Sequence, residues 1–311
     1  MYSGLKLNKE KTEGLWLGSN SENINAPLGI SWPTKPLRIL GVYHLYNTAD
    51  CNKYNFEEKI NNTKSVMNLW KMRNLTILGR IQIVKTFIIS KFLYTCSVIS
   101  TPQGYIKEIN RIIYNFIWKS RTDKLKRSIM VSNIERGGLK TPDLQLMIDS
   151  SKINWIRRYL SPENHVWKAT MKSFFVNHGI DFDVLLQSNF KGSQILKTDI
   201  PDFYKEMLRI WSEIGQTEPF EKDVFLWYNQ NITINKGPVF YPEFYQLGMK
   251  HVKDLYDGNS KLISFSKWAR RGLQSSHFMK WAGLISAVST LAKVSQQIPG
   301  IPGNYPGKSP S

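Results

Sequence analysis

The stretch Glu57–Ile99 reads EEKINNTKSVMNLWKMRNLTILGRIQIVKTFIISKFLYTCSVI. An apolar run begins after Thr76, whose hydroxyl can accept a hydrogen bond from a free amide in the first turn of a helix. On a helix with about 100° per residue, five apolar side chains share one face: Ile77, Ile81, Val84, Ile88 and Phe92. This periodicity predicts a long amphipathic helix over 76–98, and we expect another helix over 57–70 before it.

Three basic side chains flank the apolar face of this helix. Arg80 and Lys91 are eleven residues apart and fall within about 20° of each other at its border, whereas Lys85 lies on the other flank. One explanation is a core helix whose charged residues are simply solvated. The other is a helix whose basic border contacts a polyanion.

The same stretch contains a succession of short motifs. Trp70 is followed by Arg-Asn-Leu-Thr at 73–76 and by Gly79-Arg80, and the apolar helix then carries the pair Leu93-Tyr94. This succession resembles the thumb of a non-LTR (LINE-type) retrotransposon reverse transcriptase, an RNA-directed DNA polymerase. Gly79 within a helix costs about 1 kcal/mol relative to Ala, which predicts close backbone approach by a neighbouring element.

Positive charge is concentrated in one part of the chain. The 311 residues carry a net charge of +18, with a pI of about 9.7. Residues 53–140 hold 17 Lys and Arg against 5 Asp and Glu, a net +12. An excess of this kind is typical of proteins that bind polyanions such as nucleic acids.

Cysteine and histidine usage argues against a disulfide framework or a metal site. Cys51 and Cys96 are the two cysteines, and the five histidines are scattered without metal-ligand spacing. We therefore expect no metal and no cofactor. The start of the chain lacks a signal-peptide pattern, and the longest apolar run, 81–89, is too short to span a bilayer. We expect an intracellular protein, cytoplasmic or nuclear, that does not enter a membrane.

The N-terminal part predicts a small β region before residue 45. Leu5 to Asn8 and Gly14 to Gly18 have strand character and suggest a hairpin, and Leu37 to Tyr43 predicts a further strand. The first two segments resemble the edge of the polymerase palm, where Lys11 matches a basic motif residue. Leu40, Gly41 and Val42 resemble the core of the primer-grip hairpin of the same family, in which Gly41 would let the backbone approach a primer.

Two more helices and a basic loop follow the first apolar helix. Apolar spacing predicts a helix over 103–118, with Lys107, Arg111 and Asn115 off its apolar stripe. The loop 118–127 is strongly basic and contains Lys124, Lys126 and Arg127, which suit phosphate contacts, although such a run can also be merely solvated. Asp143 can cap a helix over 143–160.

We therefore predict a mainly α protein with a small N-terminal β piece. The expected domains are a palm remnant over 1–48, a basic helical thumb-like bundle over 49–160 and a helical post-thumb domain over 161–295. A Pro- and Gly-rich tail over 296–311 should be disordered. Five tryptophans of the third region are expected as core anchors: Trp167, Trp211, Trp227, Trp268 and Trp281.

The polymerase resemblance lacks its catalytic centre. That family uses a pair of adjacent Asp residues and a third Asp to hold two metal ions, and this sequence contains no Asp-Asp pair. We expect a fragment that is inactive by itself and that binds RNA or an RNA–DNA hybrid without sequence preference. The alternative is an inert or protein-interacting fragment, and the oligomeric state stays open. The expected phosphate contacts are Arg73, Arg80, Lys85, Lys91, Lys124, Lys126 and Arg127.

Overall fold

The computed structural model describes residues 6–16, 25–32, 36–45, 47–120, 122–192, 200–214, 224–258 and 261–297. The chain divides into two compact units, Met1–Lys152 and Ile153–Ser311, which are described separately. Both are mainly helical, and the sheets among the described residues are two short antiparallel pairs. The predicted mainly α class with a small N-terminal β piece is confirmed. The unit boundary falls within a helix, Leu144–Leu160, whereas the predicted domain boundary lies at the end of that helix.

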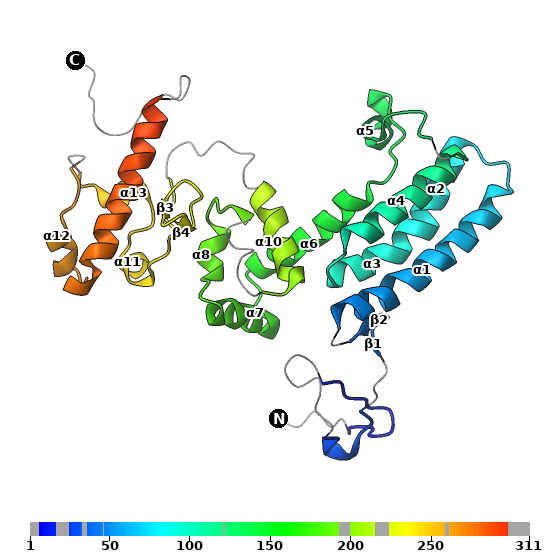
Figure 1. The fold of residues 1–311 in the computed structure, drawn as a ribbon, viewed down its shortest axis with the longest axis horizontal. Coiled ribbons are helices and arrows are strands. Elements are labelled where there is room, and N and C mark those ends of the chain that lie inside the picture. Colours follow the sequence, from blue (N-terminus) through cyan, green and yellow to red (C-terminus); the bar gives the residue numbers. More distant parts are fainter. Residues whose placement is uncertain are drawn as a thin grey trace. The chain divides into compact units, whose positions relative to one another are not determined.

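Unit 1 is built on long helices that pack side by side (Figure 1). They are α1 Thr48–Lys71, α2 Ile77–Ile83, the π-helix η3 Val84–Ile89, α3 Ser90–Val98 and α4 Gln103–Trp118. The predicted helix over 103–118 is confirmed, and so is the one over 76–98, although its middle has π geometry. The Thr76 hydroxyl accepts from Gly79 N at 3.2 Å, as its capping role predicts.

The helix predicted over 57–70 begins earlier than expected, at Thr48. Asn47 caps it: its side-chain oxygen accepts from Ala49 N at 2.8 Å and from Asp50 N at 3.4 Å. The added turns bring Asn55 and Phe56 into the helix, and both are fully buried.

The predicted apolar face forms the core of unit 1. Ile81, Val84, Ile88 and Phe92 are buried and share one cluster with buried side chains of α1 and α4, while Ile77 packs at its edge. Gly79 does not bring a neighbouring element close, contrary to our expectation. A Cβ there would first meet side-chain atoms of Thr76 and Leu75, at 3.4 and 3.7 Å, which belong to the cap of its own helix.

A tight hairpin precedes α1, as the resemblance to a primer-grip hairpin implied, and it divides the segment 37–43 that the residue pattern predicted as one strand. Strands β1 Leu37–Ile39 and β2 Val42–His44 pair antiparallel around a two-residue turn. Leu40 and Gly41 both have positive φ, 48° and 84°, which such a turn requires and which interrupts an extended strand. Figure 1 shows this hairpin next to the N-terminal end of α1.

The hairpin predicted near the N-terminus is not formed within 6–16. That segment contains one isolated bridge, Glu13 to Ser31, and a short 3-10 turn lies nearby at Pro27–Gly29 (η2). Leu7 is exposed there, and Trp16 stacks on Trp32 at 4.6 Å between ring centroids.

The end of unit 1 contains α5 Arg127–Val131, the 3-10 turn η4 Ile134–Arg136 and the beginning of α6 Leu144–Leu160. Asp143 Oδ1 accepts from Leu146 N at 3.1 Å, as its predicted capping role requires. Lys152 of α6 is fully buried, and its ammonium donates to the Ile99 carbonyl at 2.6 Å, so this lysine anchors α6 to the end of α3.

Unit 2 has its own apolar core, and most of its elements are short. They are α7 Val166–Asn177, α8 Phe182–Leu186, α10 Asp202–Ile214, β3 Thr233–Ile234, β4 Gly237–Pro238, α11 Pro242–Gln246, η6 Val252–Leu255, α12 Phe265–Arg270, η7 Ser275–His277 and α13 Phe278–Gln297. Trp227 and Trp268 are buried in this core, and the other three predicted anchors pack against it. The tail predicted to be disordered over 296–311 begins too early, because Gln296 and Gln297 belong to α13. Its remainder, 298–311, lies outside the described residues.

Candidate nucleic-acid interface

Arg80 was expected to contact phosphate, and the structure gives its guanidinium two partners within the protein. Its Nε donates to the Leu75 carbonyl at 3.1 Å, and a terminal nitrogen donates to the carbonyl of Ile117. Ile117 is fully buried at the end of α4, so this arginine ties the start of α2 to the end of α4. The geometry fits a structural role for Arg80.

Lys91 belongs to a group of three basic side chains, hereafter the hairpin cluster: Arg38 of β1, Lys59 of α1 and Lys91 of α3. The Lys59 ammonium donates to the Thr95 hydroxyl across the interface of α1 and α3. Burial lowers the pKa of Lys59 below its usual value, and the Cys96 thiol opposes this effect. The like charges of Arg38 and Lys91 lower the same pKa further. Arg38 pairs with Tyr43 across the hairpin, and Tyr43 is bound by Asn55, one helical turn before Lys59. Lys91 lies one turn before Thr95, the partner of Lys59. Sequence analysis had named only Lys91 of these three.

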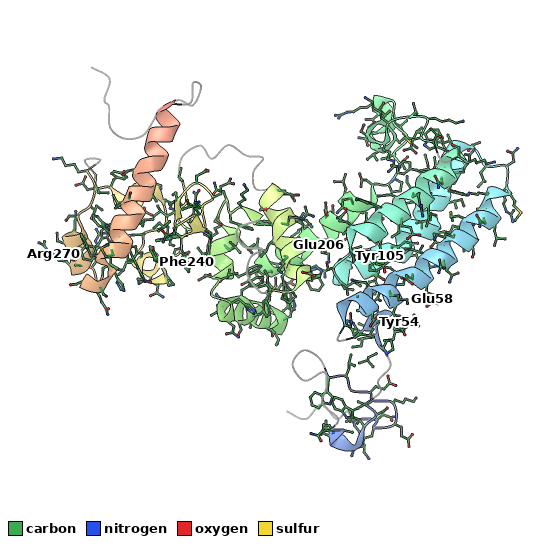
Figure 2. All side chains as sticks on the ribbon, viewed as in Figure 1. Tyr54, Glu58, Tyr105, Glu206, Phe240 and Arg270 are labelled. Atoms are coloured by element: carbon green, nitrogen blue, oxygen red, sulfur yellow. The ribbon has the colours of Figure 1, made fainter. Side chains whose placement is uncertain are left out.

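A buried asparagine holds the hairpin on α1. Asn55 accepts from Tyr43 N at 2.9 Å and donates to the Tyr43 carbonyl at 2.7 Å and to the Cys51 carbonyl at 2.9 Å. Tyr54, labelled on α1 in Figure 2, lies against Tyr43 at 5.8 Å between ring centroids. These contacts fix Arg38, two residues before the turn, relative to Lys59.

The turn of the hairpin, which was expected to act like a primer grip, is exposed. Leu40 is 83% exposed, and a Cβ added at Gly41 would meet no atom within 4 Å. Val42, in contrast, is buried. Lys11 lies on an exposed polar turn whose amides, those of Glu10 and Lys11, donate to the Asn8 side chain.

The other predicted contacts are divided between two places. Arg73 is exposed and lies over the ring of Trp70 at 5.3 Å, and Trp70 in turn contacts Phe87 at 5.6 Å between centroids. Lys85 is half-buried in the π-helix, two residues before Phe87. A cation stacked on partly exposed aromatic rings is a surface that nucleic-acid bases can also contact.

Both lysines predicted as phosphate contacts in the basic loop before α5 are in solvent. Lys124 and Lys126 are exposed, whereas Arg127 donates to Asp123 at 2.8 Å and covers the Tyr114 ring at 4.1 Å. Arg127 therefore fastens α5 to α4, and its charge is partly neutralised by Asp123.

A groove between α1 and α4 was missed by the sequence analysis. Its volume is about 560 Å³, and its lining comprises three cations, two asparagines and two apolar side chains: Lys64, Lys71, Arg111, Asn68, Asn115, Met67 and Ile112. The signal was present as spacing. Lys64, Asn68 and Lys71 recur every three or four residues, as do Arg111 and Asn115, so each set lies on one face of its helix.

The described residues contain no cluster of side chains that could bind a metal ion. Among these residues, no three His, Cys, Asp or Glu side chains come together as a metal site would require. Neither Cys51 nor Cys96 is in a disulfide, and the Cys51 thiol donates to the Tyr43 carbonyl at 3.1 Å.

One helical stretch corrects the expectation that no apolar segment is long enough to span a bilayer. Within the described residues, Ile77–Val98 is long and apolar enough to cross a bilayer by length and composition, because the helix extends beyond the apolar run 81–89. A single such helix is weak evidence, since core helices of soluble proteins pass the same test. Here its apolar face packs against α1 and α4.

Two known proteins are similar to the chain. One is the "Transposon TX1 uncharacterized 149 kDa protein" of Xenopus laevis, 24% identical over 221 residues, or 68% of this chain and 17% of that protein. The other is a "Putative ribonuclease H protein" of Arabidopsis thaliana, 26% identical over 128 residues, or 39% of this chain and 20% of that protein. No protein-family model matches. The similarities point to a retrotransposon-related protein, and the chain spans a fifth or less of the length of these relatives.

Proposed function

We propose that unit 1 binds RNA or an RNA–DNA hybrid without sequence preference, as the thumb of a LINE-type reverse transcriptase would. The hairpin cluster carries this proposal: the register of β1, the contacts of Asn55 and the bond from Lys59 to Thr95 bring basic side chains of β1, α1 and α3 to one place beside an exposed turn. Like charges are costly to hold together, so their convergence favours a polyanionic ligand that neutralises them.

The distribution of charge between the units supports the same proposal. Unit 1 holds 23 basic and 11 acidic residues, net +12, whereas unit 2 holds 19 and 13, net +6. The assigned cations are Lys and Arg side chains spread over the hairpin, the helices and the basic loop of unit 1. Contacts of this kind position a nucleic-acid backbone and carry no direct sequence information.

The test is binding of a labelled RNA–DNA hybrid to the full chain at several salt concentrations, measured by filter retention. Five to seven phosphate contacts should give a slope of log K against log salt of roughly −4 to −6. The contacts assigned here are Arg38, Arg73, Lys85, Lys91, Lys124 and Lys126, with Arg127 contributing less. A flat salt dependence would leave the alternative, an inert or protein-interacting fragment.

Catalysis is a separate question from binding. Because the sequence has no adjacent Asp pair, we propose that this chain by itself adds no nucleotides to a primer. Primer-extension reactions with template, deoxynucleotides and Mg²⁺ or Mn²⁺ check this. Template-dependent products above a no-protein control would refute it.

A further inference from the structure

The groove between α1 and α4 is a hollow with cations on both walls. Two contacts show that α1 and α4 run in the same direction. The rings of Phe56 and Tyr105 stack with centroids 5.0 Å apart, and further along both helices the Lys64 ammonium pairs with the Glu108 carboxylate at 2.7 Å. Tyr105 marks α4 in Figure 2. From Lys64 to Lys71 the α1 wall extends about 10 Å at 1.5 Å per residue.

The ion pairing inside unit 1 leaves this groove positive. Glu108 pairs with Lys64 at 2.7 Å and approaches Arg111 at 3.8 Å, so one carboxylate serves two cations. Lys71 has no ion-pair partner within the described part of the chain. Both pairs are substantially exposed, and such pairs contribute only about 0–1 kcal/mol to stability. Folding therefore does not require this arrangement of cations.

The other lining residues suit a ligand that is not purely anionic. Asn68 and Asn115 each offer an amide that can both donate and accept hydrogen bonds. Met67 is buried and Ile112 is partly buried, and together they provide an apolar surface between the two polar rows. Phosphates, sugar hydroxyls and base faces each find a matching group in such a groove.

The size of the groove distinguishes one strand from two. A hollow of about 560 Å³ is in the range of sites that hold small ligands, roughly 300–1,000 Å³. A short segment of a single strand fits within it, whereas the wide cylinder of a duplex can contact only its rim.

We propose that this groove binds one strand of nucleic acid, with Lys64, Lys71 and Arg111 on its phosphates and Asn68 and Asn115 on sugars or base edges. The inference rests on the proposed function and adds a second site, distinct from the hairpin cluster, that selects single strands. The junction between a hybrid and its unpaired extension is a ligand that would occupy both sites.

The experiment compares two probes on the full chain: single-stranded oligouridylate of about 12 nucleotides, within the usual site sizes for such binders, and a blunt RNA–DNA hybrid of the same length. The test variant is K71A/R111A, two exposed residues whose loss should leave the fold intact. The matched control is K267A/R270A on α12 of unit 2, which removes the same two side-chain types from exposed positions. Thermal melts verify folding of both.

K71A/R111A should weaken oligouridylate binding about tenfold and reduce its salt slope by about 1.4, the value for two single-strand contacts. K267A/R270A should change oligouridylate binding far less. The two variants should have equal effects on binding of the hybrid. Asn68→Leu, which changes no charge, should also weaken oligouridylate binding.

Three other results would overturn the inference, and they are distinguishable. Equal losses for K71A/R111A and the control would mean that bulk charge alone matters. Equal losses on both probes would remove the strand selectivity. In both cases the proposed function survives. If the unmodified chain binds neither probe, the proposed function fails as well.

Discussion

At the residue scale, Arg80 shows how one arginine at the border of an apolar face can belong to the interior of the protein. Its position on the helical wheel is the same for a phosphate contact and for a structural tie. The distinction depends on the carbonyl of Ile117, 37 residues away, which accepts from its guanidinium. The sequence contains no signal for that pairing, because it arises only when α4 ends next to α2.

Arg80→Ala should lower the unfolding free energy by about 1.5–3 kcal/mol, because hydrogen bonds from a charged donor are lost and a buried carbonyl is left unpaired. The salt slope of hybrid binding should stay unchanged. Urea unfolding and filter binding of the same variant measure both quantities. Lys124→Ala is the reverse control, since an exposed loop lysine should cost little stability and reduce the slope by about one. A reduced slope with unchanged stability for Arg80→Ala would restore its phosphate role.

Asn55 is a second residue whose role depends on a contact that its sequence position does not reveal. Asn55→Ala should lower the free energy of unfolding by about 1–3 kcal/mol, because the backbone N–H and carbonyl of Tyr43 both lose the buried Asn55 side chain as their hydrogen-bond partner. We expect faster amide hydrogen exchange at Val42–His44 and weaker hybrid binding, since Arg38 would no longer be held beside Lys59. The exposed Asn62→Ala serves as control. Unchanged protection of the hairpin amides would show that Asn55 does not hold it.

At the scale of elements, the sequence predicts what repeats along one helix and misses what depends on neighbours. The periodic faces of 76–98 and 103–118 and the Thr76 and Asp143 caps could be read directly, because each is local. The early start of α1, the positive-φ turn at Leu40–Gly41 and the π geometry of Val84–Ile89 could not, since packing or unusual dihedrals decide them. The groove needed α1 and α4 to be paired in parallel, which spacing along either helix does not specify.

The junction of α6, α7 and α8 in unit 2 predicts a pH dependence of stability. Asp183 accepts from the Tyr159 hydroxyl at 2.6 Å and from the Lys172 ammonium. Burial alone would raise the pKa of this carboxyl, but the hydrogen bonds from Lys172 and Tyr159 lower it below its usual value. A carboxyl with a lowered pKa in the folded state adds stability above about pH 4, and this stability is lost as the pH falls through the folded pKa.

Asp183→Asn should therefore be less stable than the unmodified chain near pH 7, and the difference should shrink toward zero as the pH falls below about 4. Thermal melts across this range, followed by circular dichroism, provide the measurement. Asp202→Asn is the control. The Asp202 carboxylate is 69% exposed and forms a weak ion pair with Lys205, at a distance of 3.9 Å. A constant difference at every pH would mean that Asp183 acts by shape and not by charge.

At the scale of the whole molecule, two apolar cores and an uneven charge divide the chain. One core is formed by residues between Phe56 and Ile148, the other by residues between Ile156 and Val288. Chains with separate cores commonly unfold in more than one step. The proposed ligand contacts lie in unit 1, which also has the larger net charge. Binding should therefore stabilise one core and not the other.

We expect two thermal transitions, of which only the unit 1 transition rises when hybrid is added. At a ligand concentration about 100 times Kd, binding to the folded state adds about 2.7 kcal/mol, which corresponds to a rise of roughly 5–10 °C for a unit of this size. Scanning calorimetry with and without hybrid measures it, and high salt should abolish the shift because the contacts are electrostatic.

Core variants assign the two transitions independently of the ligand. Phe92 and Phe244 are fully buried in the cores of units 1 and 2 respectively. Phe92→Leu should lower only the transition that hybrid raises, and Phe244→Leu should lower only the other, because each substitution leaves a defect in one core. If hybrid instead raises the transition that Phe244→Leu lowers, the ligand binds unit 2, and the assignment of phosphate contacts to unit 1 is wrong even though binding itself is real. If one variant lowers both transitions together, the cores unfold cooperatively, and the location of the ligand must be decided from the salt slopes of the charge variants alone.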